Sequence, residues 1–402
     1  MDRKIRLAYL VSHPIQYQAP LLRLIAADPD IDLTVFFCSD YSLREHKDKG
    51  FGQTIKWDVP LVEGYRHVFL PSFAAGGPPT ALRPINHGLA GYLKDGDYDV
   101  LWVHGYMRLY HLISMWRARR QGRIVLNRDE AWAYSAARGP IKAIVKRLFY
   151  ALLRRVCHGW LVIGTANRDY YLASGMQEQT LFTVPYAVDN SAFATRAAKA
   201  AKSRDELRSE LNLEDGRPVV LYASKFMERK RPEDLVAAFA KIVTEPDARR
   251  PYLVLVGDGD RHDALLDLTK SLNIEQSVRF AGFRNQSELP RFYDLCDVFV
   301  LPSLLEPWGL VVNEVMNAGR AVIVSDQVGS AADLVKKGEN GLIFPAGNVD
   351  ALADALRQVL SNPERCKAMG EKSRQIIGAW GFQQDVAGLK QALAHFCRTS
   401  AP

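Results

Sequence analysis

Between residues 302 and 314 the chain reads Pro302-Ser303-Leu304-Leu305-Glu306-Pro307-Trp308-Gly309-Leu310-Val311-Val312-Asn313-Glu314. A short apolar run before it predicts a strand that ends near Leu301, so Glu306 falls in the loop that follows. Gly309 lets the backbone approach a ligand closely. The helix expected from Leu310 would direct its free N–H groups and its positive end at a phosphate. This order of strand, loop and helix indicates the ligand-binding edge of an α/β sheet.

Two acids frame this stretch. Glu306 is placed to hold sugar hydroxyls, and Glu314, about one turn into the helix, to accept hydrogen bonds from two adjacent hydroxyls such as those of a ribose. Taken singly, the first is better explained as a solvated loop acid and the second as an early-helix acid favoured by the dipole. Their combination with Trp308, Gly309 and Leu310 in one order predicts a site for a nucleotide sugar.

Short apolar runs alternate with helical patterns along the whole chain. In the first half they predict strands at 5–12, 33–38, 100–104, 124–127 and 160–164. In the second half they predict strands at 219–223, 252–256, 278–281, 298–301, 321–324 and 342–344. Strands separated by helices imply parallel sheets with right-handed crossovers. Such sheets bind ligands beyond the carboxyl ends of their strands.

The two series predict an α/β protein of two Rossmann-like domains that face each other across a cleft. A length of 402 residues is compatible with two or three domains. We expect residues 1–186 to form the first domain and residues 187–379 the second. The amphipathic pattern within 380–402 predicts a helix that either caps the second domain or crosses back to the first, to which we assign it.

The positive charge of the chain is concentrated in its first half. The formal net charge is +7, and residues 1–200 carry 26 Lys and Arg against 17 Asp and Glu. Such an excess indicates an anionic partner: nucleic acid, an acidic membrane or a phosphorylated substrate. A solubilising surface excess explains it equally well. The basic residues are scattered and no nucleic-acid-binding module is present, so nucleic acid is not expected.

The cysteines and the apolar runs bear on metal binding and location. The five cysteines lie far apart without metal-ligand spacing, at Cys38, Cys157, Cys296, Cys366 and Cys397. We therefore expect no metal and no cofactor, and reduced thiols in a cytoplasmic protein. The first apolar run is only strand-length, and no run reaches the roughly 18 residues of a membrane-spanning helix.

The quoted stretch resembles the Glu–seven residues–Glu motif of family-four retaining glycosyltransferases of GT-B fold. The resemblance is strong over about 180–360 and weaker before it. Other segments resemble further motifs of this family: Ala223-Ser224-Lys225 with Glu228-Arg229-Lys230-Arg231-Pro232, Val256-Gly257-Asp258-Gly259, Phe280-Ala281-Gly282-Phe283, Ser325-Asp326-Gln327-Val328-Gly329, Gly338-Glu339-Asn340-Gly341-Leu342, and the hinge-like Val184-Pro185-Tyr186-Ala187-Val188-Asp189.

The resemblance implies a metal-independent transfer of sugar from a nucleoside diphosphate, UDP more often than GDP. The acceptor would be a hydroxyl of a bacterial surface polysaccharide, a lipopolysaccharide or another glycoconjugate, lipid-linked acceptors included. It implies that Lys225 and Lys230 neutralise the departing diphosphate and that Glu306 holds the sugar. Gly257 and Phe283 would lie against the nucleotide. Because no residue is an obvious nucleophile, the resemblance implies front-face attack, with the leaving phosphate accepting the proton.

The chain also departs from the family. Ser224-Lys225 stands where Gly-Arg is usual, and lysine lacks the bidentate fork of arginine. The first strand runs into Ser12-His13-Pro14 without a glycine-rich loop. Where relatives place a histidine near the sugar, this chain has Asn127-Arg128-Asp129-Glu130. We keep His13, His104, Arg128 and Asp129 as candidates for substrate contacts, although strand-end histidines are as often structural.

One amphipathic segment raises the question of a membrane. Apolar residues recur at helical spacing at Ile141, Ile144, Val145, Leu148, Phe149, Leu152, Leu153 and Val156, with Lys142, Lys146, Arg147, Arg154 and Arg155 between them. A basic amphipathic helix can lie on an anionic membrane, at the inner face of the cell membrane in this case. A helix that packs on a core shows the same stripe, and we expect the core.

Two other functions fit parts of the sequence. One is a nucleotide-sugar epimerase of the same two-domain build, which needs acids and histidines that eliminate and re-add the nucleotide; no such set is found. The other is a non-catalytic binding or scaffold protein that uses the basic half. Release of nucleotide from a donor, and its dependence on an acceptor, separates a transferase from both.

Overall fold

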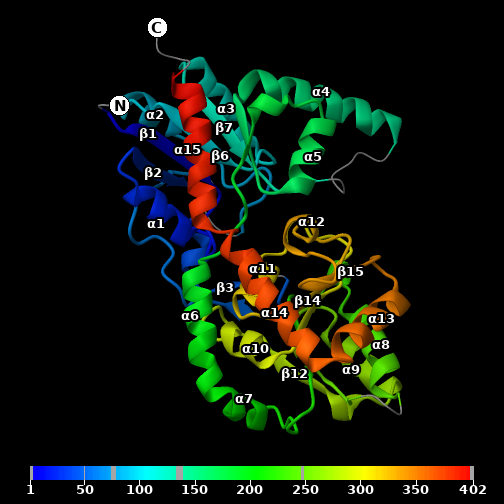
Figure 1. Cartoon of the computed structure of the whole chain (residues 1–402). Coiled ribbons are helices and arrows are strands. Elements are labelled where there is room, and N and C mark those ends of the chain that lie inside the picture. Colours follow the sequence, from blue (N-terminus) through cyan, green and yellow to red (C-terminus); the bar gives the residue numbers. More distant parts are fainter. Residues whose placement is uncertain (1–2, 49, 74–77, 133–138, 246–248, 399–402) are drawn as a thin grey trace. The chain divides into compact units, whose positions relative to one another are not determined.

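The computed structural model describes residues 3–48, 50–73, 78–132, 139–245 and 249–398. The chain divides into two compact units (Figure 1). Unit 1 comprises Met1–His46, Val59–Tyr186 and Phe382–Pro402, and unit 2 comprises Lys47–Asp58 and Ala187–Gly381. Each unit is described by itself.

Unit 1 is built on a seven-stranded sheet in which every paired strand is parallel. Its order is β5-β2-β1-β6-β7-β8-β9. The strands are β1 (Ile5–Val11), β2 (Ile31–Phe37), β5 (Arg66–Phe69), β6 (Val100–His104), β7 (Ile124–Arg128), β8 (Gly159–Val162) and β9 (Leu181–Thr183). From Leu7 to Val11, successive residues of β1 are buried, because helices cover both faces of such a sheet. The strand order reverses between β1 and β6, which makes the loops after them the ligand-binding position of this sheet.

The helices of unit 1 are α1 (Ala19–Ala27), α2 (Leu89–Asp95), α3 (Leu109–Arg120), α4 (Pro140–Val156), α5 (Thr165–Ala173) and α15 (Phe382–Arg398), with short 3₁₀ turns η1 (Tyr41–Leu43) and η3 (Glu178–Thr180). The last helix, α15, packs on α1, β8 and β9 and is drawn in red in Figure 1. Leu389, Ala392 and Leu393 of α15 are buried in the core of this unit beside Leu7 and Leu161. The C-terminal helix therefore belongs to the same core as the first strand.

Unit 2 contains a six-stranded parallel sheet of order β12-β11-β10-β13-β14-β15. The strands are β10 (Val219–Ala223), β11 (Tyr252–Val256), β12 (Val278–Gly282), β13 (Val298–Leu301), β14 (Ala321–Ser325) and β15 (Gly341–Phe344). The order reverses between β10 and β13, where Val220 pairs with Val298. By the same rule, the loops after β10 and β13 flank the ligand-binding position.

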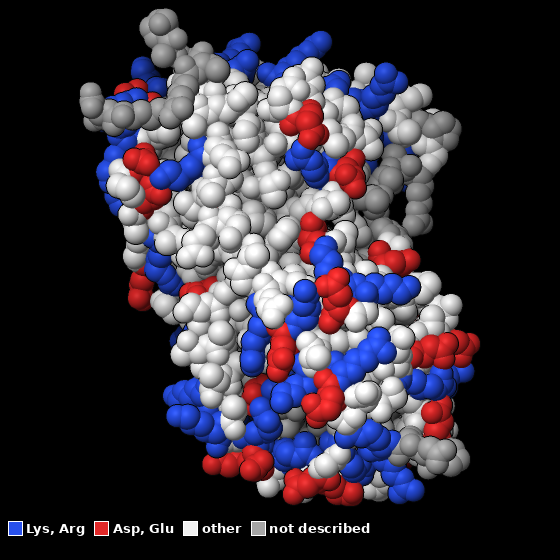
Figure 2. Space-filling model, viewed as in Figure 1, with Lys and Arg blue, Asp and Glu red and all other residues white. Residues whose placement is uncertain are grey.

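Helices cover both faces of this second sheet. They are α6 (Asn190–Ala200), α7 (Arg204–Glu210), α8 (Pro232–Val243), α9 (His262–Ser271), α10 (Leu289–Leu295), α11 (Leu310–Asn317), α12 (Ala331–Leu334), α13 (Val349–Leu360) and α14 (Pro363–Gly378), with 3₁₀ turns η4 (Ala201–Ser203), η5 (Glu228–Lys230) and η6 (Glu275–Ser277). Sequence features fix several helix starts: Pro232 begins α8, and the Asn348 side chain caps α13. On the face seen in Figure 2, basic and acidic side chains alternate over this unit.

The α/β class with parallel sheets in two domains is confirmed, while the cleft between the domains stays a prediction. The structure also contains elements that the sequence patterns did not indicate. Strand β5 is one, and the two-stranded hairpin of β3 (His46–Lys47) and β4 (Thr54–Ile55) is another. Residues 47–58, assigned from the sequence to the first domain, group with unit 2, because they contact the loops at the carboxyl edge of its sheet.

Candidate functional site

A buried ion pair joins the two loops at the switch point of unit 2. The Lys230 ammonium, which follows β10, donates to Oε2 of Glu306, which follows β13. Lys230 is 8% exposed and Glu306 is 9% exposed. Charged side chains are rarely buried unless they are paired, because removing them from water is costly. The pair therefore fixes two of the three predicted catalytic residues beside each other.

The backbone holds Glu306 in place through the loop after β14. The Glu306 N–H donates to the Gln327 carbonyl at 3.2 Å, and the Gly329 N–H donates to the Glu306 carbonyl at 2.8 Å. A Cβ on Gly329 would overlap the Pro307 carbonyl, so only glycine fits there. These backbone hydrogen bonds thus join two of the sequence motifs, the segment 302–314 and the segment 325–329.

Gly309 turns the chain into α11. Its φ is +89°, in the left-handed region that favours glycine, and a Cβ would also crowd Glu306 and Val328. Leu310 is the first residue of the eight-residue helix, whose free N–H groups begin at this point. The predicted geometry of glycine followed by a helix N-terminus is present.

The Trp308 side chain is buried, whereas a side chain that contacts a ligand must be accessible. It is 3% exposed, its Nε1 donates to Oδ1 of Asn313 at 2.9 Å, and its ring stacks on Trp380 at 5.5 Å. The indole packs inside unit 2 and orients the start of α11. The predicted substrate contact through this side chain is not supported by its burial.

Glu314 is half-buried on α11 and accepts a hydrogen bond from Tyr293 Oη at 2.5 Å. Burial raises the pKa of its carboxyl to about 7, against the opposing effects of that hydrogen bond and of Arg196. The carboxyl is therefore close to half-protonated at neutral pH. Tyr293, which no sequence pattern indicated, is the partner that sets its orientation.

Glycines let the loops after β10, β11 and β12 pack backbone against backbone. Gly257 has φ +139°, and a Cβ there would overlap the carbonyl oxygen of Ser224. Its N–H donates to the Gly282 carbonyl at 2.9 Å. Gly257 is thus held in close backbone packing, and its predicted contact with the nucleotide stays a prediction.

The third predicted catalytic residue, Lys225, is engaged by the hairpin. Its Nζ lies 2.7 Å from Oδ1 of Asp48 and 4.5 Å from the centre of the Phe51 ring. Phe51 in turn packs edge-to-face on the half-buried Phe283, with ring centres 4.7 Å apart. Lys225 and Phe283, both predicted to contact the nucleotide-sugar donor, thus contact residues of the same hairpin turn. No sequence pattern indicated Asp48 or Phe51, because their neighbours in space are far away in the chain.

Unit 1 gathers polar side chains at its own switch point, after β1 and β6. Gln18 Nε2 lies 3.2 Å from the His104 ring nitrogens, and Tyr186 Oη lies 3.1 Å from His104 Nε2. Burial lowers the pKa of His104 well below its ordinary value, and burial with Arg108 and His46 lowers that of His13 to about 4. Both histidines are therefore neutral at pH 7. His104 belongs to an internal polar network with Gln18 and Tyr186, neither of which was predicted as a site residue, whereas His13 Nδ1 lies 2.8 Å from Ser12 Oγ.

Arg128 and Asp129 are buried and make their contacts within unit 1. Arg128 is 2% exposed, pairs with Asp385 of α15 at 2.8 Å and donates to the Pro185 carbonyl at 3.0 Å. Asp129 accepts hydrogen bonds from Asn127, the Ala131 N–H and Tyr171. Burial raises its pKa to about 6. These contacts engage both side chains inside unit 1, and their predicted contacts with the substrate stay predictions.

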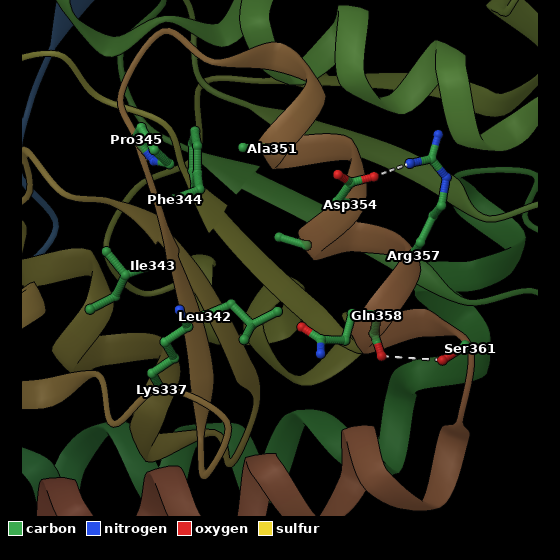
Figure 3. Close-up of a pocket in the computed structure, with 11 residues that line it drawn as sticks. Lys337, Leu342, Ile343, Phe344, Pro345, Ala351, Asp354, Arg357, Gln358 and Ser361 are labelled. Atoms are coloured by element: carbon green, nitrogen blue, oxygen red, sulfur yellow. Dashed lines mark hydrogen bonds and ion pairs between the residues drawn. The ribbon is translucent and has the colours of Figure 1, made fainter.

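A groove lies along the edge strand β15 and helix α13. It encloses about 630 Å³, and Arg357 pairs with Asp354 at its rim (Figure 3). Its lining contains none of the predicted site residues. In the part of the chain that the structure describes, no group of three His, Cys, Asp or Glu side chains could hold a metal ion, and no helix has the length and apolar run needed to cross a membrane.

Comparison with known sequences identifies the family to which a chain with these features belongs. A family model described as "Glycosyl transferases group 1" matches residues 203–376. The N-acetyl-alpha-D-glucosaminyl L-malate synthase of Bacillus anthracis is 34% identical over 172 residues, 43% of this chain and 44% of that protein. An uncharacterized glycosyltransferase of Methanocaldococcus jannaschii is 35% identical, over 39% of each chain. The chain thus spans less than half of these two relatives.

A longer match comes from Mycobacterium tuberculosis. Its GDP-mannose-dependent alpha-(1-6)-phosphatidylinositol monomannoside mannosyltransferase is 30% identical over 347 residues, 84% of this chain and 85% of that protein. A glycosyltransferase from Rickettsia africae shares the fold with a TM-score of 0.75 at 14% identity, over 99% and 100% of the two chains. Anabaena HepE in complex with UDP and glucose gives 0.72 at 17%, over 98% and 100%. The chain belongs to the group 1 glycosyl transferases, the family-four glycosyltransferases of GT-B fold.

Proposed function

We propose that this chain transfers a sugar from a nucleoside diphosphate to a hydroxyl acceptor, with retention at the anomeric carbon and without a metal. The observation that carries the proposal is the buried Lys230–Glu306 pair at the switch point of unit 2, directly before the N-terminus of α11. It offers one cation, one hydroxyl-binding carboxylate and free backbone N–H groups at the position where open α/β sheets bind ligands.

The chemistry assigns a separate task to each group. The bond between the anomeric carbon and the diphosphate oxygen breaks, and a new bond from the acceptor oxygen forms on the same face. The acceptor proton passes to the leaving diphosphate, so no protein base is needed. Lys230 and the first N–H groups of α11 stabilise the charge that grows on the phosphate. Glu306 holds the hydroxyls of the sugar, and Glu314 those of the ribose.

The base of the donor is proposed to be uracil. The HepE structure named above contains UDP, whereas the mycobacterial relative is named for GDP-mannose. Both bases therefore enter the test. Purified chain is incubated with UDP- and GDP-sugars, and release of nucleoside diphosphate is measured with and without lipid-linked or polysaccharide acceptors. Release that depends on an acceptor supports a transferase, while release equal in a Glu306→Gln variant contradicts the assigned site.

We also propose that the acceptor is presented at the inner face of the cell membrane. The expected core packing of α4 holds only for the half with Phe149, Leu153 and Val156. The other apolar residues are exposed: Ile141 at 77%, and Ile144, Val145, Leu148 and Leu152 at 60% each. Nearby, α3 and the residues before it expose Met107, Leu109, Ile113 and Trp116.

The charge around these residues suits an anionic lipid surface. Residues 100–168 carry 13 Lys and Arg but only two acids, Asp129 and Glu130. Exposed apolar side chains surrounded by cations bind the interface of anionic membranes. The five free cysteines fit a reducing cytoplasmic side. Sedimentation with phosphatidylglycerol vesicles tests this: wild-type chain should pellet and an Ile144→Asp/Leu148→Asp variant should not. Equal sedimentation of the two contradicts the proposed surface.

A further inference from the structure

The hairpin of residues 47–58 has a tight, internally bonded turn. The Asp48 N–H donates to the Gln53 carbonyl at 3.0 Å, and the Gly52 N–H to the Asp48 carbonyl at 2.9 Å. The Asp48 carboxylate also accepts from the N–H groups of Gly50 at 2.7 Å and Phe51 at 3.0 Å. The turn is thus organised around one carboxylate.

This turn lies on the carboxyl edge of the second sheet, where it meets the loops after three neighbouring strands. After β10 it meets Lys225, through Asp48 and Phe51. After β11 it packs so closely that a Cβ on Gly259 would lie 2.9 Å from the Gly50 carbonyl oxygen.

After β12 the contacts are hydrogen bonds. Asn285 Nδ2 donates to the Lys56 carbonyl at 2.7 Å, and both the N–H and the hydroxyl of Ser287 donate to Asp58. The hairpin therefore covers the edge at which this sheet is expected to bind the donor.

We propose that this hairpin acts as a clasp that the donor opens. In the closed clasp the Asp48 carboxylate takes the place of a donor phosphate on Lys225, and the diphosphate of the donor displaces it. The inference rests on the proposed function, because it takes Lys225 as a phosphate ligand. The ligand class is a nucleoside diphosphate or its sugar. When the clasp opens, Phe51 leaves Phe283, and that ring becomes available to the base.

The Asp48 carboxylate and a diphosphate cannot both bind the Lys225 ammonium, because the two anions repel each other. Burial works against ionisation of Asp48, but Lys225 and the two backbone N–H groups outweigh it and hold its pKa below the ordinary value. The carboxylate therefore stays charged at neutral pH. A diphosphate on the same ammonium would face it at a few ångströms, and like charges at that distance repel. Binding of the donor thus requires Asp48 to move.

A closed clasp lowers the affinity for the donor, because only the open fraction of molecules can bind. Removing the carboxylate charge removes that cost while the side-chain oxygen of asparagine can still accept from the turn N–H groups. Asp48→Asn should therefore bind nucleoside diphosphate more tightly than wild type. The expected gain is roughly 3- to 10-fold, the range for loss of a partly exposed ion pair plus relief of repulsion.

Titration calorimetry with UDP and with GDP tests this on wild type, Asp48→Asn and a matched control, Asp32→Asn. Asp32 forms a more exposed ion pair with Arg66 in unit 1, so the control removes the same charge without touching the hairpin. Tighter binding by Asp48→Asn alone supports the clasp. Equal or weaker binding than wild type overturns it. If neither nucleotide binds wild type or Asp48→Asn, the proposed function itself fails.

Hydrogen exchange gives an independent readout on the wild-type chain. If UDP opens the clasp, the Ser287 amide loses Asp58 as its acceptor and exchanges faster with UDP than without it. Slower exchange at this amide would mean that the hairpin closes on the nucleotide instead, and it would overturn the proposal even if the Asp48→Asn variant binds UDP more tightly than wild type.

Discussion

The switch points of the two sheets use their charges differently. In unit 2 a cation and an anion, Lys230 and Glu306, are buried at the ends of two strands, with a helix N-terminus beside them. In unit 1 the strand ends carry His13 and His104, which are neutral at pH 7, while the buried cation Arg128 is paired with Asp385.

Under the proposed function, in which unit 2 binds the donor and unit 1 the acceptor, the difference follows from the two ligands. A diphosphate needs positive charge and backbone N–H groups, and such groups leave a recognisable pattern of Lys, Glu and Gly. A hydroxyl acceptor needs only neutral donors and acceptors, which many residues supply. On this proposal the donor side is chemically constrained, and the acceptor side is free to change.

The largest effect is expected from Glu306. Glu306→Gln keeps an oxygen that accepts from Lys230 but loses the charge, so transfer should fall at least about 100-fold with some loss of stability, because the Lys230 charge is left uncompensated. Glu306→Ala should lose activity as well and more stability, because it also removes the oxygen that accepts from Lys230. Initial rates and thermal unfolding of both variants check this. Activity of Glu306→Gln near the wild-type level would remove Glu306 from the site.

We expect the opposite pattern in unit 1, where a substitution should lower stability without changing the affinity for the donor nucleotide. Asp385→Ala strands Arg128 inside the protein, and about 3–5 kcal/mol of unfolding free energy should be lost. Lys390→Met on the same helix breaks a part-buried pair with Asp28 and an exposed pair with Asp30, and it should cost much less than Asp385→Ala. Urea unfolding gives both values, and UDP affinity of the folded variants should equal that of wild type. A selective loss of UDP affinity in Asp385→Ala would contradict the separation of roles.

A backbone contact should give a smaller effect on the donor side. Gly257→Ala places a methyl group on the Ser224 carbonyl at a positive φ, so the loops after β10 and β11 must separate. We expect a stability loss of about 1–3 kcal/mol and weaker UDP binding. Gly216→Ala, at another positive φ with open space around it, controls for backbone strain. Equal UDP affinity in the two variants would show that the close packing at Gly257 is unimportant for the ligand.

The smallest effect is a pH dependence at Glu314, whose pKa is raised to about 7. Below that pH the folded chain keeps the proton, and a protonated carboxyl accepts fewer hydrogen bonds from a ribose. UDP affinity should therefore rise as pH increases from 6 to 8, and the slope should vanish in Glu314→Gln. Calorimetric titrations at three pH values decide this. An equal slope in the variant would assign the pH dependence to another group.

The strands, loop and helix of unit 2 were predicted from the sequence because their signals are local. Alternating apolar runs located the strands of unit 2, and the order of Glu306, Gly309 and Glu314 located the loop and helix. Gly257 was recognisable because only glycine tolerates its close contacts.

The features that were missed depend on contacts between distant segments. Arg128 resembled a ligand contact until Asp385, 257 residues away, accounted for its charge. The burial of Trp308 was not predicted, because a motif position says nothing of burial, and its substrate contact stays a prediction. The stripe on α4 was expected to face a core, but periodicity shows only that residues share a face and not what covers it. Asp48 and Phe51 gave no signal for the same reason.

The most direct test of the donor site is calorimetric titration of UDP and GDP into wild type and a Lys230→Met/Glu306→Gln double variant. Replacing both members removes the charges without leaving one of them buried alone, so the melting temperature should stay close to that of wild type. We predict that wild type binds one of the two nucleotides and that the double variant binds it at least about 10-fold more weakly, as expected for loss of a charged hydrogen bond. Wild-type affinity in a folded double variant would contradict the proposal that this ion pair marks the donor site.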